Sequence, residues 1–369
     1  MDLKAERAHK HKRVVELLAK HGLDAVLLTR RCNFSWYTCG ARNYVSAADD
    51  AGNSTLLVTR QGAAVLTTNI EATRLAAEEL SARGIQTVAY SYADASERLA
   101  AFRQAIGARR AAADVPLPGV GAAALPPGFD RLRWVLTAAE VQRYRAVCRD
   151  VVAAVEAVAR RAEPGQTEDE LAGMTAYELR RRGCLPWVLL VAADERMQKH
   201  RHPLPTGHRI ERYFMVATGA ERGGLIAACS RLAHFGKAPA DLAARHEAVC
   251  TVDAALISAT RPGAMLGDLF AEAQAAYAAA GFPDEWRMHH QGGSTGYLPR
   301  EVRAGPGDKT AALDGQAFAW NPSIAGTKSE DTILCTAGGP QVLAAPTGWP
   351  VVRAAWKGFQ IDRPAILER

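Results

Sequence analysis

RYFMVATGAERGGLIAACSRL, the stretch Arg212–Leu232, decides the fold because it predicts a β-hairpin with its turn at Glu221–Gly224. Both arms are rich in apolar residues, and a Gly-Gly pair adopts the φ angles of a tight turn without steric cost. Helical patterns flank the hairpin on both sides, at 137–165 and 166–183 before it and at 239–260 and 265–281 after it. Further strand patterns follow at 316–322 and 331–336. This order predicts an α+β domain whose helices pack on one face of a mostly antiparallel sheet.

The two helices predicted before the hairpin carry their own start signals. Thr137 is followed three residues later by Glu140, and Thr167 is followed by Glu170. In this spacing the hydroxyl and the carboxylate each bind a backbone N–H at the helix start, which is a capping box. We therefore expect helices to begin at both threonines.

The first third of the chain follows a different pattern. RVVELLAKHG predicts a helix ending at Gly22, DAVLLT predicts a buried strand, and the alternation of helices and strands continues from there. This rhythm is typical of a compact α/β domain. We therefore predict two domains, 1–135 and 136–369.

Composition limits the classes of function. The chain has 369 residues, 48% of them apolar, and a net charge of +6. Its arginines are spread along predicted helices, which argues against a nucleic-acid partner, and no run of 18 apolar residues predicts a membrane span. Seven cysteines at irregular spacings, without a CxxC pair, favour reduced thiols and a cytoplasmic location.

Met288–Tyr297, MHHQGGSTGY, places two histidines beside glycines and hydroxyl groups. Such histidines serve as metal ligands, as acid–base groups, or as polar residues that only close a turn. A hard divalent cation would also need carboxylates from elsewhere in the chain.

Several motifs in this order resemble the pita-bread superfamily of aminopeptidase P, prolidase, methionine aminopeptidase and creatinase. They are EPGQTEDEL (163–171), KHRHPLPTG (199–207), RPGAMLGDLFAEAQAAYAAAGF (261–282) and SEDTIL (329–334). RCNFSWYTCG (31–40) and NIEATRLAAEEL (69–80) resemble the N-terminal domain of the aminopeptidase P, prolidase and creatinase branch. The resemblance implies a C-terminal pita-bread domain preceded by a smaller α/β domain.

The metallopeptidases of this superfamily bind two metal ions through two aspartates, one histidine and two glutamates. The aspartates lie eleven residues apart on the two arms of the hairpin. The matching positions here are Ala217, Ala228, His290 (or His289), Asn321 and Glu330. A methyl group donates nothing to a metal, and two remaining ligands do not hold two cations. The resemblance therefore predicts no metal and no other cofactor.

The creatinase branch of the superfamily works without metal. By resemblance, His202 would be the general acid/base, His290 a second proton-transfer group, and Glu330 the anchor for a cationic group of the substrate. We therefore expect a metal-independent hydrolase, or lyase, acting on a C–N bond of a small amino-acid-like substrate. The predicted substrate-binding residues in this domain are His289, Tyr297, Arg300 and Asn321.

Two alternatives remain open. One is a metallopeptidase of the Xaa-Pro aminopeptidase or prolidase type with relocated ligands, taken from His200, His202, His289, His290, Asp194 and Glu330. The other is a pita-bread module that only binds a partner. Structural readings of single residues also stand: His202 as a solvated loop residue, and Glu330 with Asp331 as a surface acidic pair.

The resemblance also implies a homodimer in which the N-terminal domain of one subunit approaches the active site of its partner. Trp36, Tyr37, Arg42 and Tyr44 are the candidates for that contact. Trp36 could equally fill the core of its own domain.

Overall fold

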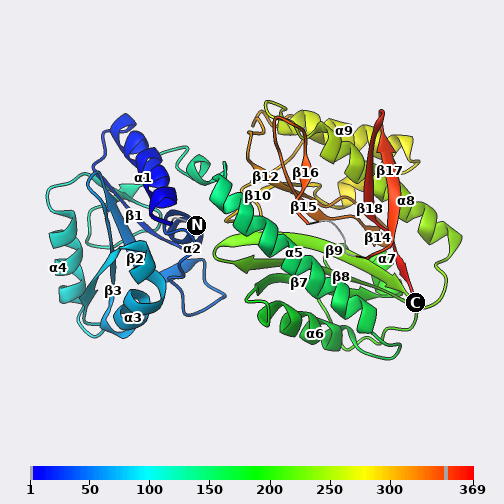
Figure 1. Ribbon diagram of the computed structural model, residues 1–369, viewed down its shortest axis with the longest axis horizontal. Helices are drawn as coiled ribbons and strands as arrows, with labels where there is room; N and C mark the ends of the chain where they lie inside the picture. The colour runs from blue at the N-terminus through cyan, green and yellow to red at the C-terminus, as the bar shows by residue number, and fades with distance from the viewer. Residues whose placement is uncertain (1–2, 345–347) are drawn as a thin grey trace. The chain divides into compact units, whose positions relative to one another are not determined.

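The computed structural model describes residues 3–344 and 348–369. The chain divides into two compact units, Met1–Arg133 and Trp134–Arg369. Figure 1 shows a helix-and-sheet arrangement in each of them.

The N-terminal unit is built on a six-stranded mixed sheet in the order β4-β3-β2-β1-β5-β6. The strands are β1 (Ala25–Arg30), β2 (Ala51–Thr59), β3 (Ala63–Thr68), β4 (Gln86–Tyr90), β5 (Ala111–Ala113) and β6 (Ala123–Ala124). The α-helices are α1 (Leu3–Lys20), α2 (Arg31–Tyr37), α3 (Asn69–Arg74) and α4 (Ala95–Ile106). The predicted α/β character of this part of the chain is confirmed.

One helix of this unit is less regular than its sequence suggests. After α3 the chain continues through a π-helical turn, Leu75–Leu80, and a 3-10 turn, Ser81–Arg83. Gly84 then ends the element in the left-handed conformation, with φ of 61°. Glycine suits this position because it adopts the left-handed conformation without a Cβ clash.

The C-terminal unit contains a nine-stranded sheet with the main order β11-β10-β12-β15-β9-β8-β7. Strand β16 pairs with β15, and β19 pairs in parallel with β9. The strands of this sheet are β7 (Leu185–Ala193), β8 (Tyr213–Arg222), β9 (Leu225–His234), β10 (Gly292–Thr295), β11 (Val302–Arg303), β12 (Ala317–Trp320), β15 (Asp331–Leu334), β16 (Gln341–Val342) and β19 (Leu367–Glu368). The sheet is mostly antiparallel, as predicted.

The hairpin that decides the fold is β8–β9. Its register runs from Tyr213 opposite His234 to Arg222 opposite Leu225, so the turn holds only Gly223 and Gly224. Their φ angles are 60° and 81°, which only glycine adopts freely. The predicted hairpin is confirmed.

Helices α5 (Ala138–Arg161) and α6 (Glu168–Arg180) pack on strands β7 to β9 (Figure 1). Both capping boxes are present, with Thr137 and Thr167 as the N-caps. Helices α8 (Ala240–Ala259) and α9 (Leu266–Ala279) pack against each other, and their apolar faces share a core with β12 and β15. A short helix, α7 (Glu195–Lys199), precedes β8.

The chain after residue 336 lies beyond the last strand pattern identified in the sequence. It forms the hairpin of β17 (Val351–Trp356) and β18 (Phe359–Pro364), which packs against α8. Two further short strands, β13 (Ser323–Ile324) and β14 (Thr327–Lys328), also pair outside the main sheet. The sequence of this hairpin lacks the apolar pattern that predicts a buried strand, because most residues of β17 are exposed or half-buried.

All seven cysteines are buried. Burial raises the pKa of five of them, to about 12 for Cys250 and about 11 for Cys335. Among residues 3–344 and 348–369, no helix combines the length and the apolar character that a bilayer crossing requires.

Candidate active site

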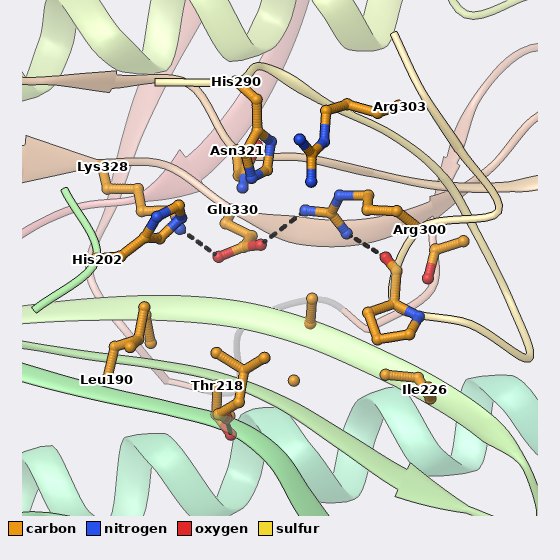
Figure 2. A pocket seen from close by; sticks show the side chains of 16 residues that line it. Leu190, His202, Thr218, Ile226, His290, Arg300, Arg303, Asn321, Lys328 and Glu330 are labelled. Atoms are coloured by element: carbon orange, nitrogen blue, oxygen red, sulfur yellow. Dashed lines mark hydrogen bonds and ion pairs between the residues drawn. The ribbon is translucent and has the colours of Figure 1, made fainter. Parts of the chain in front are cut away.

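A pocket of about 210 Å³ lies inside the C-terminal unit, between the hairpin and the last strands of the sheet. Strands β7 to β9 supply a mainly apolar wall, which includes Leu190 and Ile226. Figure 2 shows the charged side chains and the imidazoles on the opposite wall. The pocket therefore has one face for aliphatic groups and one face for polar chemistry.

All five positions that match the superfamily's metal ligands line this pocket: Ala217, Ala228, His290, Asn321 and Glu330. Ala217 lies on β8, and Ala228 lies on β9. By the resemblance, two aspartates would donate oxygen atoms at these positions, whereas alanine offers only a methyl group. The residues present do not fit a two-metal centre of that kind, because only one carboxylate remains.

Glu330 is already neutralised by the protein. Ser230 Oγ donates to its Oε2 at 2.7 Å, Lys328 Nζ lies 3.0 Å from Oε2, and Arg300 Nη2 lies 3.6 Å from Oε1. Burial alone would raise the pKa of this carboxyl, but the charges of Lys328 and Arg300 outweigh it and hold the pKa below its usual value. A cationic substrate would have to displace these partners.

The pocket has an excess of positive charge. Arg300, Arg303 and Lys328 line it with a single carboxylate, Glu330. Arg303, on β11, is exposed and makes no hydrogen bond or ion pair within residues 3–344 and 348–369. A guanidinium without a partner on a pocket wall is suited to a carboxylate or phosphate group of a ligand.

Three histidines meet at the polar wall. His202, in the loop after α7, and His290 line the pocket, while His289 is 7% exposed and lies against His202. The Nε2 atoms of His202 and His289 are 2.9 Å apart, so one ring donates a hydrogen bond to the other. Burial and neighbouring cations lower the pKa of all three rings, to about 3 for His290. The three imidazoles are therefore neutral at physiological pH.

The glycines after His290 fix the path of this segment. A Cβ on Gly292 would lie 2.2 Å from the carbonyl oxygen of Ala319, and one on Gly293 would lie 2.1 Å from that of Val302. Both residues have positive φ angles. They let β10 fit between β11 and β12, which places the two histidines at the edge of the pocket.

Other predicted site residues lie elsewhere. Tyr297 is buried, donates to Glu140 Oε1 at 2.7 Å, and is not part of the pocket lining. Trp36 is fully buried in the N-terminal unit, in edge-on contact with Tyr37 and Phe129. Arg42 pairs with the Glu79 carboxylate at 2.8 Å within the same unit.

Two residues from the pool of relocated ligands are positioned away from this cluster. The Asp194 carboxylate accepts three backbone N–H groups at 2.8 to 3.1 Å, from Glu211, Arg212 and Tyr213. His200 is exposed and does not line the pocket. The histidines that come together are His202, His289 and His290.

Sequence reasoning missed Arg303, Lys328 and Ser230. Lys328 precedes Glu330 by two residues in an extended segment, so the alternation of side chains could have indicated that both face the same side. Ser230 pairs with Glu330 across one hundred residues of sequence, and no local signal predicts that contact.

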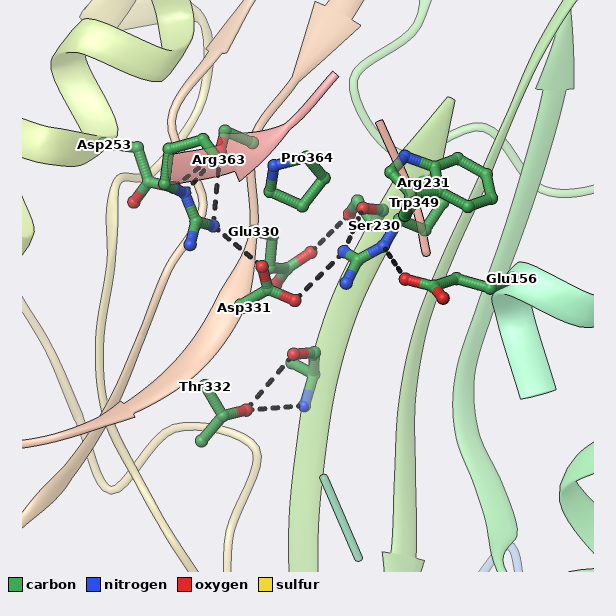
Figure 3. A network of polar contacts seen from close by, with 12 residues as sticks. Glu156, Ser230, Arg231, Asp253, Glu330, Asp331, Thr332, Trp349, Arg363 and Pro364 are labelled. Carbon is green, nitrogen blue, oxygen red and sulfur yellow. Dashed lines mark hydrogen bonds and ion pairs between the residues drawn. The ribbon is translucent and has the colours of Figure 1, made fainter. Parts of the chain in front are cut away.

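A buried ion network lies directly behind the pocket (Figure 3). Arg231 contacts Glu156 at 3.1 Å and Asp331 at 3.0 Å. Arg363 contacts Asp331 at 2.9 Å and Asp253 at 2.8 Å. Because Glu330 and Asp331 are only 6% and 3% exposed, the alternative that they form a surface acidic pair is wrong.

Two family models match the chain. The creatinase/prolidase N-terminal domain matches residues 10–155, and metallopeptidase family M24 matches residues 142–337. No curated protein matches.

Solved structures share the fold at low sequence identity. A prolidase from Pyrococcus horikoshii OT3 is 20% identical, with a TM-score of 0.76, over 92% of this chain and 99% of that one. An Xaa-Pro dipeptidase from Bacillus anthracis is 17% identical, with a TM-score of 0.76, over 98% and 100%. The N-terminal domain of the FACT complex subunit SPT16 from chickpea, Cicer arietinum, is 13% identical, with a TM-score of 0.66, over 94% and 96%.

At these identities the solved structures establish the pita-bread fold and nothing further. The M24 model, which spans more than half of the sequence, establishes the family. This chain belongs to metallopeptidase family M24.

Proposed function

We propose that this protein is a hydrolase that cleaves a C–N bond in a small, anionic, amino-acid-derived substrate such as a dipeptide. The observation that carries the proposal is the charge of the pocket, where three cationic side chains accompany one carboxylate beside the imidazoles. The volume of about 210 Å³ is below the usual 300–1,000 Å³ of drug-sized sites, so the substrate is small.

The comparisons favour a peptidase chemistry. The family model is that of a metallopeptidase, and two similar structures are titled prolidase and Xaa-Pro dipeptidase. They support the alternative of an M24 peptidase with relocated ligands better than the expected metal-independent enzyme. Because Ala217 and Ala228 carry no donor atoms, the two-metal centre of the superfamily takes no part in this proposal.

The pocket residues have separate roles in the proposed reaction. Arg303, with Arg300 beside it, binds the substrate carboxylate, and the apolar wall takes its aliphatic part. Asn321, whose buried Oδ1 has no partner within the described residues, accepts a hydrogen bond from a substrate N–H. In hydrolysis the water oxygen bonds to the carbonyl carbon, the C–N bond breaks, and a proton passes to the leaving nitrogen.

A second candidate is the metal-independent hydrolase or lyase expected from the creatinase resemblance. The loss of both aspartates favours it, and so does His202, which lines the pocket. The pKa of His202 is lowered, chiefly by burial, so its ring is neutral and can accept a proton from water. Metal-independent catalysis stays a prediction until activity is measured in chelator.

The test is a panel of dipeptides, Xaa-Pro members included, assayed by mass spectrometry with free or amidated C-termini. We expect cleavage of dipeptides with a free carboxylate, and a loss of roughly tenfold or more in kcat/KM on amidation or in Arg303→Gln. Equal cleavage of the amidated series would contradict the anionic specificity. Binding of panel members without any turnover would leave the non-catalytic module as the function.

The homodimer also stays a prediction. Since Trp36 and Tyr37 are buried, Arg42 and Tyr44 are the candidates left to approach a partner subunit's site, and the Arg42 guanidinium is half exposed beside Glu79. Light scattering on the full chain would give the oligomeric state. Arg42→Ala should then lower kcat/KM without changing that state.

A further inference from the structure

The three histidines form a cluster with the dimensions of a metal site. One ligand nitrogen from each of His202, His289 and His290 lies within 4.8 Å of the others. The rings of His289 and His290 stack with centroids 4.6 Å apart, and the His202 ring meets that of His289 edge-on at 4.7 Å. Residues 87 positions apart in the sequence thus converge on one point.

Two nitrogen atoms of the cluster are left unsatisfied. The Nδ1 atoms of His289 and His290 are buried and have no hydrogen-bond partner within residues 3–344 and 348–369. An imidazole binds an ion through one nitrogen, and the His289 nitrogen that faces His202 is Nε2, so an ion held between these two rings leaves the His289 Nδ1 unpaired. The Nδ1 of His290 is the unpaired nitrogen that such an ion can satisfy, and a buried polar atom without a partner costs about 1–3 kcal/mol.

We propose that His202, His289 and His290 bind one divalent transition-metal ion, of the zinc or cobalt class. Resting on the hydrolase proposal, this site would be the relocated metal centre of the enzyme. A tetrahedral zinc with Zn–N distances of about 2.0–2.1 Å places its nitrogen ligands about 3.3 Å apart. The pair now at 2.9 Å would open slightly, and the other contacts would close by about 1.5 Å at most.

The surroundings select the kind of metal. Lys328, Arg300 and Arg303 lie around the histidines, and Glu330, the carboxylate that lines the same pocket, is already paired. Magnesium and calcium prefer oxygen ligands, which this cluster does not offer, whereas imidazole suits zinc, cobalt and copper. The neighbouring cations also lower the affinity for any cation, so we expect micromolar rather than picomolar binding.

The site faces the substrate pocket. His202 and His290 line the pocket, and His289 lies behind them. A metal ion there would act as a Lewis acid toward the carbonyl of a substrate whose carboxylate is bound by Arg303 and Arg300. Its ligand set, three neutral nitrogens, differs from the carboxylate-rich set of the superfamily.

The experiment uses the full chain, treated with chelator and dialysed, and titrated with cobalt(II) chloride and zinc chloride in separate runs. We expect one zinc or cobalt ion per chain by calorimetry, with visible d–d absorption for cobalt, and no heat with magnesium chloride. His202→Ala and His289→Ala should each weaken binding at least tenfold. The matched control is His200→Ala, an exposed histidine two residues from the cluster that should bind as the wild type does.

Several outcomes would overturn the site. If the wild-type chain binds no metal, the site is overturned whether or not the variants fold. Unchanged metal affinity in folded His202→Ala and His289→Ala would overturn it as well. Because binding is measured without substrate, the two proposals fail separately. Metal binding without hydrolysis removes only the proposed function, and hydrolysis by a chain that binds no metal removes only this site.

Discussion

The pocket and the ion network behind it are two charged regions built from adjacent residues, and they differ in how their cations are paired with carboxylates. In the network each arginine, Arg231 and Arg363, contacts two carboxylates. In the pocket three cations accompany one carboxylate, and Arg303 has no partner within the described residues. The network therefore has more carboxylates than cations and leaves neither arginine unpaired, whereas the pocket has more cations than carboxylates.

Strand alternation separates the two regions by a single residue. On β9, Ser230 binds Glu330 in the pocket wall, and the next residue, Arg231, binds Asp331 on the other side. Successive side chains of a strand point to opposite faces, so one pair of strands serves both regions. A register slip of one residue would exchange the two sets.

The largest effect is expected from breaking the network. Arg231→Met leaves Asp331 and Glu156 buried without that cation, which should lower the free energy of unfolding by about 3–5 kcal/mol. The matched control is Arg303→Met, which should change it by less than about 0.5 kcal/mol because Arg303 is exposed and unpaired in the described structure. Urea unfolding measures both. Equal losses would show that the two regions do not differ.

A comparison of imidazoles sharpens the contrast. His246 on α8 has both nitrogens paired, with Nε2 donating to the Pro364 carbonyl at 2.8 Å and Nδ1 accepting from Thr327 Oγ1 at 2.7 Å. Burial lowers its pKa to about 4. Since the unfolded value is about 6.5, the stability is complete above pH 6.5 and falls as the pH drops toward 4.

His246→Gln should remove this part of the pH dependence. Between pH 6.5 and 5 the free energy of unfolding of the wild type should fall by about 2 kcal/mol more than that of the variant, since one pKa unit is about 1.4 kcal/mol. Urea unfolding at both pH values gives the difference. Parallel curves for the two proteins would mean that the pKa of His246 is the same in the folded and unfolded states.

Removing the unpartnered guanidinium should affect binding and spare stability. Arg303→Gln should weaken the binding of inorganic phosphate by roughly 10- to 100-fold, since a charge-assisted hydrogen bond contributes about 1.5–3 kcal/mol. Calorimetry measures the dissociation constant. Arg353→Gln, an exposed arginine of the outer hairpin, is the control and should bind phosphate normally.

The smallest effect is that of salt. Raising sodium chloride from 50 to 500 mM should weaken phosphate binding in the pocket by roughly threefold or more, because the Debye length shortens to a few ångströms. The difference in unfolding free energy between wild type and Arg231→Met should not change, because buried pairs are screened much less. A salt dependence of both quantities would place solvent in the network.

Local signals predicted much of the fold. The Gly223–Gly224 turn and the capping boxes at Thr137 and Thr167 each depend on residues close in sequence. The outer β17–β18 hairpin was missed because its strands are not buried, although Lys357–Gly358 at its turn, both with positive φ, was a turn signal.

The site was harder to predict because its contacts are not local. The resemblance indicated the five positions that line the pocket, and the missing aspartates were visible in the sequence. Two features of the site depend on how the strands pair. They are the pairing of Glu330 with Lys328 and Arg300, and the contact between His202 and His289. No pattern within one segment contains that information.

The buried cysteines are natural probes of local unfolding in the two units. Cys32 and Cys39 lie in the N-terminal unit, and the other five lie in the C-terminal unit. Only a thiolate attacks an alkylating reagent, so a thiol that is covered and whose pKa is raised reacts when its surroundings transiently unfold. The rate at which iodoacetamide modifies each cysteine would therefore measure transient local unfolding in each of the two units separately, without an added label.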